Sequence, residues 1–174
     1  MATDLEARMR QLEARVTQLE DDKAIREVLA RYGYNADGGR DQAYVDLYTD
    51  DGVVNIGTYV SFGSGYKDIT QWKGKKEIMG FITDPKAHKA IEGRCMHVQG
   101  NNFMTVVNGD DAKCYSYSMV LLKPSPEYEG VAIRSAGYSE WTMKKVNGKW
   151  LIKERVRRAA AGQGAKELLA KLPK

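Results

Sequence analysis

Residues 31–40 read RYGYNADGGR and mark the point where a long helical pattern in the chain ends. The apolar residues Ile25, Val28 and Leu29 precede this stretch at spacings of three and four, which is typical of a helix with one buried face. The glycine pair then ends the helix. Asp37 falls at the C-terminal end of this helix, where the helix dipole disfavours a carboxylate. We therefore expect either a solvated loop aspartate or a carboxylate that another part of the chain holds.

A heptad pattern over residues 4–23 precedes this helix. Charged residues flank its seam, as in a helix that packs through one narrow stripe. No glycine or proline separates the pattern from residues 24–36, so one continuous helix is predicted. A frayed amphipathic arm is the alternative, because three heptads with a lysine in the seam make only a marginal coiled coil. We interpret residues 1–23 as a helical extension that contacts another subunit or the sheet. The seam residues are Leu5, Met9, Leu12, Val16, Leu19 and Lys23.

The composition bounds the class of protein. The 174 residues suit one domain, and the hydrophobic share of 43% is enough for a core. The net charge of +4 comes from 27 basic and 23 acidic residues that are interleaved, so no nucleic-acid partner is expected. Cys95 and Cys114 lack metal or redox spacing and are interpreted as buried thiols. A signal-peptide pattern and an apolar run of roughly 20 residues are both missing. We expect a soluble, cytoplasmic protein with no membrane partner.

The region after the long helix is predicted to mix short helices with one strand. Apolar spacing predicts helices over 41–49 and 74–81. Val53, Val54 and Ile56 indicate a strand between them, and the glycine-rich span 57–74 is predicted to include a mobile loop.

The C-terminal half is predicted to be a succession of strands. The pair Asn147-Gly148 predicts a tight hairpin, because both turn residues tolerate positive φ. Helices followed by antiparallel strands favour the α+β class. We place one domain over 24–160 and a C-terminal tail, with a possible last helix, over 161–174. The predicted strands cover 95–107, 112–123, 131–146 and 149–158.

The chain has two histidines, and their settings differ. His97 follows Cys95-Met96 at the start of a predicted strand, whereas His88 lies among charged residues and is expected to be exposed. A single strand histidine is often structural. An aspartate at a helix end and an inward histidine nevertheless suit a general base, because the carboxylate fixes the tautomer and leaves the other ring nitrogen free.

Four motifs in a fixed order carry a resemblance to a known family. The chain resembles the SnoaL-like branch of the nuclear transport factor 2-like superfamily over residues 20–158. Within that branch it is similar to scytalone dehydratase, bile-acid 7α-dehydratase and hexachlorocyclohexane dehydrochlorinase, which eliminate water or HCl with a His-Asp pair and no cofactor. The resemblance implies a cone, in which a curved antiparallel sheet wraps against the N-terminal helices around an apolar pocket. The motifs are Tyr32 with Asp37, Thr49 to Gly52, Met96 to Asn101 and Lys144 to Trp150.

The resemblance also implies roles for particular residues. Asp37 and His97 match the catalytic pair, and Tyr32 matches the tyrosine five residues before the aspartate of bile-acid 7α-dehydratase. The arginine of that enzyme falls at Ala159, and a shift of one residue brings in Arg158.

The chain departs from scytalone dehydratase at four positions, so scytalone itself is not expected as the substrate. The second histidine of that enzyme falls near Leu122, its pocket asparagine near Ser139, and its two tyrosines near Ala36 and Ile56.

The resemblance implies a cofactor-free lyase that eliminates water or HX from a small apolar ring compound. An isomerase or cyclase of a ketone or polyketide with the same base is one alternative, and a non-catalytic small-molecule binding module is the other. No metal is expected. A homo-oligomer, either a trimer or a dimer, is also expected. The predicted pocket residues are Trp72, Phe103, Tyr115, Ser139 and Trp141.

Overall fold

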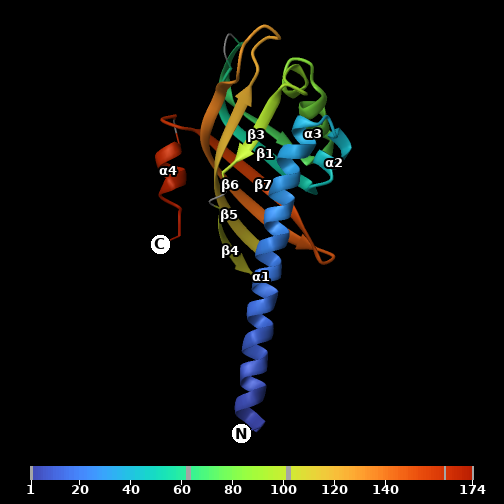
Figure 1. Cartoon of the computed structure of the whole chain (residues 1–174), viewed down its shortest axis with the longest axis vertical. Helices are drawn as coiled ribbons and strands as arrows, with labels where there is room; N and C mark the ends of the chain where they lie inside the picture. The colour runs from blue at the N-terminus through green and yellow to red at the C-terminus, as the bar shows by residue number, and fades with distance from the viewer. Residues whose placement is uncertain (1, 62–63, 101–102, 163, 174) are drawn as a thin grey trace.

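A curved sheet with most of its helices on one face makes up most of the molecule in the computed structural model, which describes residues 2–61, 64–100, 103–162 and 164–173 (Figure 1). The predicted α+β class is confirmed. The helices and strands are α1 (Ala2–Asp37), α2 (Asp41–Val45), β1 (Tyr48–Ser61), β2 (Ser64–Lys73), α3 (Gly74–Thr83), the 3-10 helix η1 (His88–Ala90), β3 (Cys95–Gln99), β4 (Met104–Asn108), β5 (Asp111–Leu122), β6 (Ala132–Val146), β7 (Lys149–Ala159) and α4 (Ala165–Leu169).

The strands follow the order β2-β1-β7-β6-β5-β3, and β4 pairs with the other half of β5. All pairs are antiparallel except β1 with β7, which is parallel. The sheet is therefore mixed, and the expectation of a purely antiparallel sheet is wrong at this one pair. The predicted strand over 95–107 is also divided, because its first part pairs with the end of β5 and its last part with the beginning.

Helix α1 runs without a break from Ala2 to Asp37, as predicted. Residues 21–37 lie along the concave face of the sheet, while residues 4–20 extend beyond it (Figure 1). The buried face of the helix repeats every three to four residues, and the helix packs mainly on strands β3 and β7. Its residues Ile25, Leu29, Tyr32 and Ala36 belong to the same core cluster as Trp141, Met143 and Ile152 of the sheet.

The glycine-rich span 57–74 is not the predicted loop. It forms most of the β1–β2 hairpin, because Val53 to Asn55 pair with Gln71 to Lys73 and the pairing continues to Ser61 and Ser64. The side chains of Tyr59, Phe62 and Tyr66 lie outside the described residues. The helix predicted over 41–49 is shorter than expected, since Tyr48 already pairs with Ile152.

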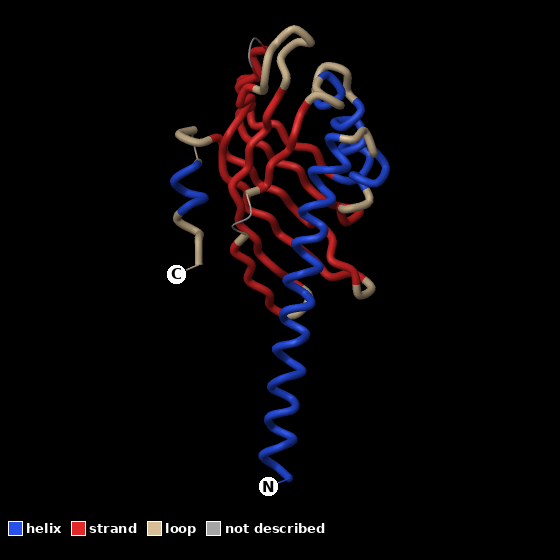
Figure 2. The backbone as a smooth tube through the Cα atoms, viewed as in Figure 1, coloured by secondary structure: helices blue, strands red, loops and turns tan. Residues whose placement is uncertain are grey.

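The remaining elements complete the two faces of the sheet. Helices α2 and α3 lie beside the end of α1, and α4 lies on the opposite face (Figure 2). The predicted Asn147-Gly148 hairpin is confirmed, with φ of 50° and 74°. Among the described residues, none of the helices combines the length and apolar character required to cross a membrane.

Candidate active site

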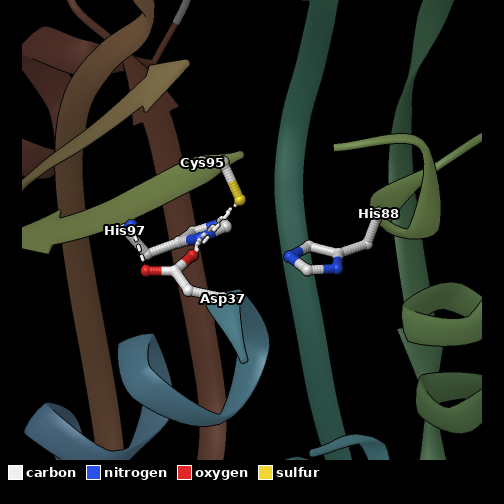
Figure 3. Close-up of side chains that lie close together, drawn as sticks. All are labelled: Asp37, His88, Cys95 and His97. Carbon is white, nitrogen blue, oxygen red and sulfur yellow. Dashed lines mark hydrogen bonds and ion pairs between the residues drawn. The ribbon is translucent and has the colours of Figure 1, made fainter. Parts of the chain in front are cut away.

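Asp37 and His97 meet where the end of α1 passes under strand β3 (Figure 3). The ring Nδ1 of His97 lies 2.5 Å from Oδ1 of Asp37, and the backbone N–H of His97 donates to Oδ2 at 2.8 Å. The thiol of Cys95 donates to Oδ1 at 3.3 Å. Gly33 allows this close approach, because a Cβ there would lie 2.8 Å from the backbone oxygen of His97. The carboxylate at the helix end is therefore held by the strand and not by the helix dipole.

These contacts fix the protonation of Asp37. Burial by itself raises the pKa of Asp37, but the hydrogen bonds from His97 and Cys95 outweigh it and lower the pKa below its ordinary value. Asp37 therefore stays ionised at neutral pH and accepts the Nδ1 proton of His97. This tautomer leaves Nε2 of His97 without a proton, as a general base requires.

A cavity of about 270 Å³ opens beside His97. Most of its exposed lining surface is apolar, as expected, and strand β7 and the segment around η1 add charged side chains to it. This volume suits a small molecule, being close to the lower end of ordinary ligand pockets. The lining residues are Tyr32, Ile56, Trp72, Phe81, Asp84, Lys86, Ala87, His88, Ile91, His97, Val120, Arg134, Ser135, Arg155 and Arg157.

Tyr32 lines the cavity and is held by Arg155, a residue that the sequence did not single out. The guanidinium donates to the Tyr32 hydroxyl oxygen through Nη1 and to Ser118 through Nη2 at 3.1 Å. It also lies over the Tyr32 and Trp141 rings, at 4.7 and 4.8 Å from their centroids. The hydroxyl of Tyr32 accepts from Arg155 and also carries a proton of its own that it can donate.

Arg158 is not among the residues that line the cavity, so the predicted arginine was misplaced. Its Nη1 donates to Asn55 Oδ1 at 2.9 Å and to the Arg157 backbone oxygen at 2.9 Å. The register between β6 and β7 shifts near Ile152, which changes the parity of the strand. Beyond this bulge Arg155 points to the concave face and Arg158 does not.

The predicted pocket residues divide between several places. Trp72 lines the cavity and packs on Phe81 with ring centroids 4.1 Å apart. Trp141 lies behind Tyr32, fully buried, and donates to Ser116 at 3.0 Å. Phe103 packs beside α1 at Arg26, whose guanidinium lies over the Phe103 ring.

Tyr115 and Ser139 do not line this cavity. They line a second cavity of about 230 Å³ next to α4. The Ser139 hydroxyl also lies 3.4 Å from Arg155, at the back of the site. Tyr115 was misplaced because strand parity turns it away from the face of its core neighbour Cys114. Ser139 shares the face of Trp141 but lies behind Arg155, a position that the sequence alone left open.

His88 is buried, contrary to the expectation of exposure, with 4% of its surface accessible. Its ring centroid lies 5.2 Å from that of His97 (Figure 3). The charged residues beside His88 in the sequence indicated an exposed segment. The 3-10 helix η1 instead turns the His88 side of this segment into the cavity.

Asp37, His88, Cys95 and His97 also form a donor set of the kind that binds zinc, with one ligand atom of each within 4.8 Å of the others. The arrangement fits hydrogen bonding better than metal coordination. Two ligands of one zinc ion lie roughly 3.3–3.8 Å apart, as bonds of about 2.0–2.3 Å at tetrahedral angles require, whereas Asp37 and His97 are 2.5 Å apart. Burial and the Asp37 carboxylate raise the pKa of Cys95 to about 12, so its thiol keeps the proton that it donates.

Comparison with known proteins yields one family match and many similar structures. The model of the SnoaL-like domain family matches residues 17–156. An NTF2-like protein with a cystatin-like fold from Novosphingobium aromaticivorans shares 28% identity, covers 91% of this chain and 94% of its own, and superposes with a TM-score of 0.76. No curated protein matches the chain.

Two more distant structures from the same organism share the fold. A candidate scytalone dehydratase is 19% identical, with 83% of this chain and 87% of its own covered and a TM-score of 0.63. The β subunit of a candidate aromatic-ring-hydroxylating dioxygenase is 20% identical, with 83% and 91% covered and a TM-score of 0.65. One fold thus carries both kinds of protein, and the site has to decide the function.

Proposed function

The chain belongs to the SnoaL-like domain family, and from this premise we propose that it is a cofactor-free lyase that eliminates water or HX from a small ring compound. The observation that carries the proposal is the Asp37–His97 hydrogen bond of 2.5 Å beside a cavity of about 270 Å³. An ionised carboxylate that accepts from Nδ1 makes Nε2 the basic atom and orients it.

The proposed reaction starts at a C–H bond next to an electron-withdrawing group. Nε2 of His97 takes the proton, and the electron pair forms a C=C bond while the neighbouring carbon loses its hydroxyl or halide. The imidazolium returns its proton to a departing hydroxide, which leaves as water, or gives it to solvent when a halide ion leaves, so His97 is neutral again. Tyr32 donates to the oxygen on which negative charge develops, and Arg155 stabilises it by donating to the Tyr32 hydroxyl.

The cavity also favours a substrate class. Of its described lining residues, three are arginines and Asp84 is the one acidic residue. This balance favours a compound that develops enolate charge, such as a ring ketone. Trp72 and Phe81 offer an apolar wall for the ring.

An isomerase or cyclase acting on a ketone would use the same base and is the second candidate. A non-catalytic binding module is the third. Exchange of α-protons separates the third from the other two, because a bound ketone exchanges its acidic protons with solvent only where a base reaches them.

The test uses tetralone in D2O, with proton exchange followed by NMR. We expect the wild-type chain to accelerate exchange, and His97→Gln to lower the accelerated rate by roughly 10²- to 10⁴-fold. Asp37→Asn should cost much of the rate, because the tautomer is no longer fixed. Unchanged exchange in His97→Gln would disprove the assignment of the base.

A second probe separates the lyase from the isomerase. A ring ketone with a β-hydroxyl group should lose water and give the conjugated enone, which is detected by its absorbance. Exchange without loss of water would favour the isomerase or cyclase.

A further inference from the structure

Both ring nitrogens of His88 lack a hydrogen-bond partner among the described residues, although the side chain is buried. Leaving a buried polar atom without a partner is destabilising, so buried groups of this kind normally meet a protein atom, water or ligand. The neighbouring rings offer no partner. The Phe81 centroid lies 6.3 Å away and is apolar, and the His97 ring is inclined by 31°.

The His88 ring points across a gap towards Asp37, Cys95 and His97 (Figure 3). The ligand atoms of the four residues lie within 4.8 Å of one another. An oxygen that makes two hydrogen bonds of about 2.8 Å at a tetrahedral angle joins atoms roughly 4.6 Å apart. The upper bound on these separations is therefore compatible with one bridging oxygen between His88 and the other three residues.

His88 meets this oxygen as a neutral imidazole. Burial and the neighbouring His97 lower its pKa to about 4. At neutral pH the ring has one N–H donor and one acceptor nitrogen. It can bind a hydroxyl or carbonyl oxygen, whereas the N–H of the neutral ring is too weakly acidic to protonate a leaving group.

We propose that the gap between His88 and His97 is a subsite for an oxygen atom of the ligand. A carbonyl or hydroxyl oxygen bound there accepts from His88, and the adjacent C–H bond then faces Nε2 of His97. The chemical class of ligand is thus a ring compound with an oxygen next to its acidic carbon. The inference rests on the proposed function for its chemistry, but binding of the oxygen does not require turnover.

The test compares two probes of one shape, tetralone and tetralin, which differ by the ketone oxygen. Calorimetric titration of the wild-type chain should give tighter binding of tetralone, by roughly tenfold for one hydrogen bond to a buried group. His88→Phe, which keeps a ring but no donor, should bind both probes equally. His88→Gln keeps a donor and should restore part of the preference.

Controls separate this subsite from the base. His97→Gln should lose proton exchange and retain the preference for tetralone, so the two proposals fail in different experiments. A preference that survives in a folded His88→Phe variant would overturn the subsite. Tight binding of Zn²⁺ alone, lost on Cys95→Ser, would overturn it in favour of a metal site.

A second inference comes from the other end of the molecule. Every described side chain from Asp4 to Glu20 is exposed, and this part of α1 extends beyond the sheet (Figure 1). An isolated helix of this length is marginal in water. Its apolar side chains are nevertheless large, as Leu5, Leu12 and Leu19 are each about 60% exposed or more.

The exposed residues follow a heptad in which leucine occupies every d position and Met9, Val16 and Lys23 the a positions. At 3.6 residues per turn the seam lies roughly 160° around the helix from the face that packs on the sheet. A second helix that packs on this seam therefore does not collide with the sheet on the other side of α1. Leucine at d with a β-branched residue at a favours two strands, and Val16 is the one β-branched residue among the three a positions named.

The charges beside the seam select an orientation. The e positions are Glu6, Glu13 and Glu20, and two g positions are Arg8 and Arg15. In a parallel pair each g position meets the e position five residues later on the other copy, so Arg8 meets Glu13 and Arg15 meets Glu20. An antiparallel pair would instead bring arginine to arginine and glutamate to glutamate.

We infer that residues 5–22 form a parallel two-stranded coiled coil with a second copy of this chain. The two sheets then lie on opposite outer sides of the helix pair. Of the expected assemblies, this inference selects the dimer over the trimer.

Sedimentation of the full chain over a concentration series tests this inference. The wild type should dimerise, and Leu12→Ser with Leu19→Ser should be monomeric and otherwise folded. A charge variant with Glu13→Arg and Glu20→Arg should dimerise weakly. The opposite variant, with Arg8→Glu and Arg15→Glu, should also dimerise weakly. An equal mixture of the two variants should dimerise as well as the wild type.

The orientation has its own readout. Leu5→Cys should form an interchain disulfide on oxidation, because equal residue numbers meet in a parallel pair, whereas Arg10→Cys, off the seam, should not. A monomeric wild type at tens of micromolar would overturn the inference. So would a dimer that the two serine substitutions leave unchanged, since it would associate through the sheet.

Discussion

The two halves of α1 share one helix and differ in what surrounds them. Residues 21–37 bury one face on the sheet and end at Asp37, whereas residues 4–20 are exposed on all sides. The apolar stripe changes faces between the halves, by roughly 160° at 3.6 residues per turn. A stripe that changes faces without a break in the helix marks a change of partner. Residues 21–37 pack on their own chain, and residues 4–20 are suited to packing on another chain.

The largest expected effect distinguishes the halves by one matched substitution. Leu29→Ala should lower the free energy of unfolding by about 2–5 kcal/mol, because a fully buried leucine leaves a cavity in the core. Leu19→Ala, at a side chain 68% exposed, should change it by less than about 0.5 kcal/mol. Urea unfolding at a concentration where the chain is monomeric measures both. Equal losses of stability in the two variants would contradict the difference between the two halves of α1.

A smaller effect is expected at the two tyrosines near the end of the helix. Tyr32→Phe removes the hydroxyl that accepts from the buried Arg155, so unfolding should become easier by about 1–3 kcal/mol. Tyr34 is 75% exposed, and Tyr34→Phe should have no measurable effect. Thermal unfolding of the pair checks the expectation. A stable Tyr32→Phe protein would mean that Arg155 finds another acceptor.

Asp21 marks the boundary between the halves and should give stability a pH dependence. Burial alone raises its pKa, but hydrogen bonds from Lys145 and Trp150 outweigh it and lower the pKa. The stabilisation is therefore complete above the ordinary pKa near 3.8 and is lost as pH falls through the lower folded value.

Asp21→Asn should accordingly cost about 1 kcal/mol at neutral pH and little in acid. Unfolding curves at several pH values test this, with Asp4→Asn in the exposed half as the control. If the free energies of unfolding of wild type and Asp21→Asn differ by the same amount at every pH, the charge of Asp21 is not the cause of the stabilisation.

The smallest expected effect is on the site. Deletion of residues 2–20 should leave tetralone exchange within about twofold of the full chain, because Asp37 and His97 lie outside the deleted segment and contact neither its side chains nor its seam. A large loss of exchange would show that the site depends on the extension.

The sequence predicted the elements whose signals are local. The continuous helix follows from spacing alone, and the Asn147-Gly148 hairpin from turn chemistry. The approach of Asp37 to His97 was expected from the family resemblance, and the hydrogen bond is present.

The parts of the site that were missed depend on non-local geometry. The bulge in β7 decides that Arg155 and not Arg158 faces the cavity, and a bulge leaves no clear mark in the sequence. His88 becomes buried only because η1 turns towards β3. The sequence indicates only a buried thiol at Cys95, and the pairing of β3 above α1 makes it a donor to Asp37.

The parallel pairing of β1 with β7 has a consequence for how the protein is made. Tyr48 to Asn55 pair with Ile152 to Val156, about a hundred residues later in the chain. During synthesis β1 and β2 can form a hairpin early, but one edge of that hairpin stays open until almost the whole chain has left the ribosome. Contacts of such high sequence separation slow folding. The last strand therefore both completes the sheet and delivers Arg155 to the cavity, so that chains stopped before it have neither.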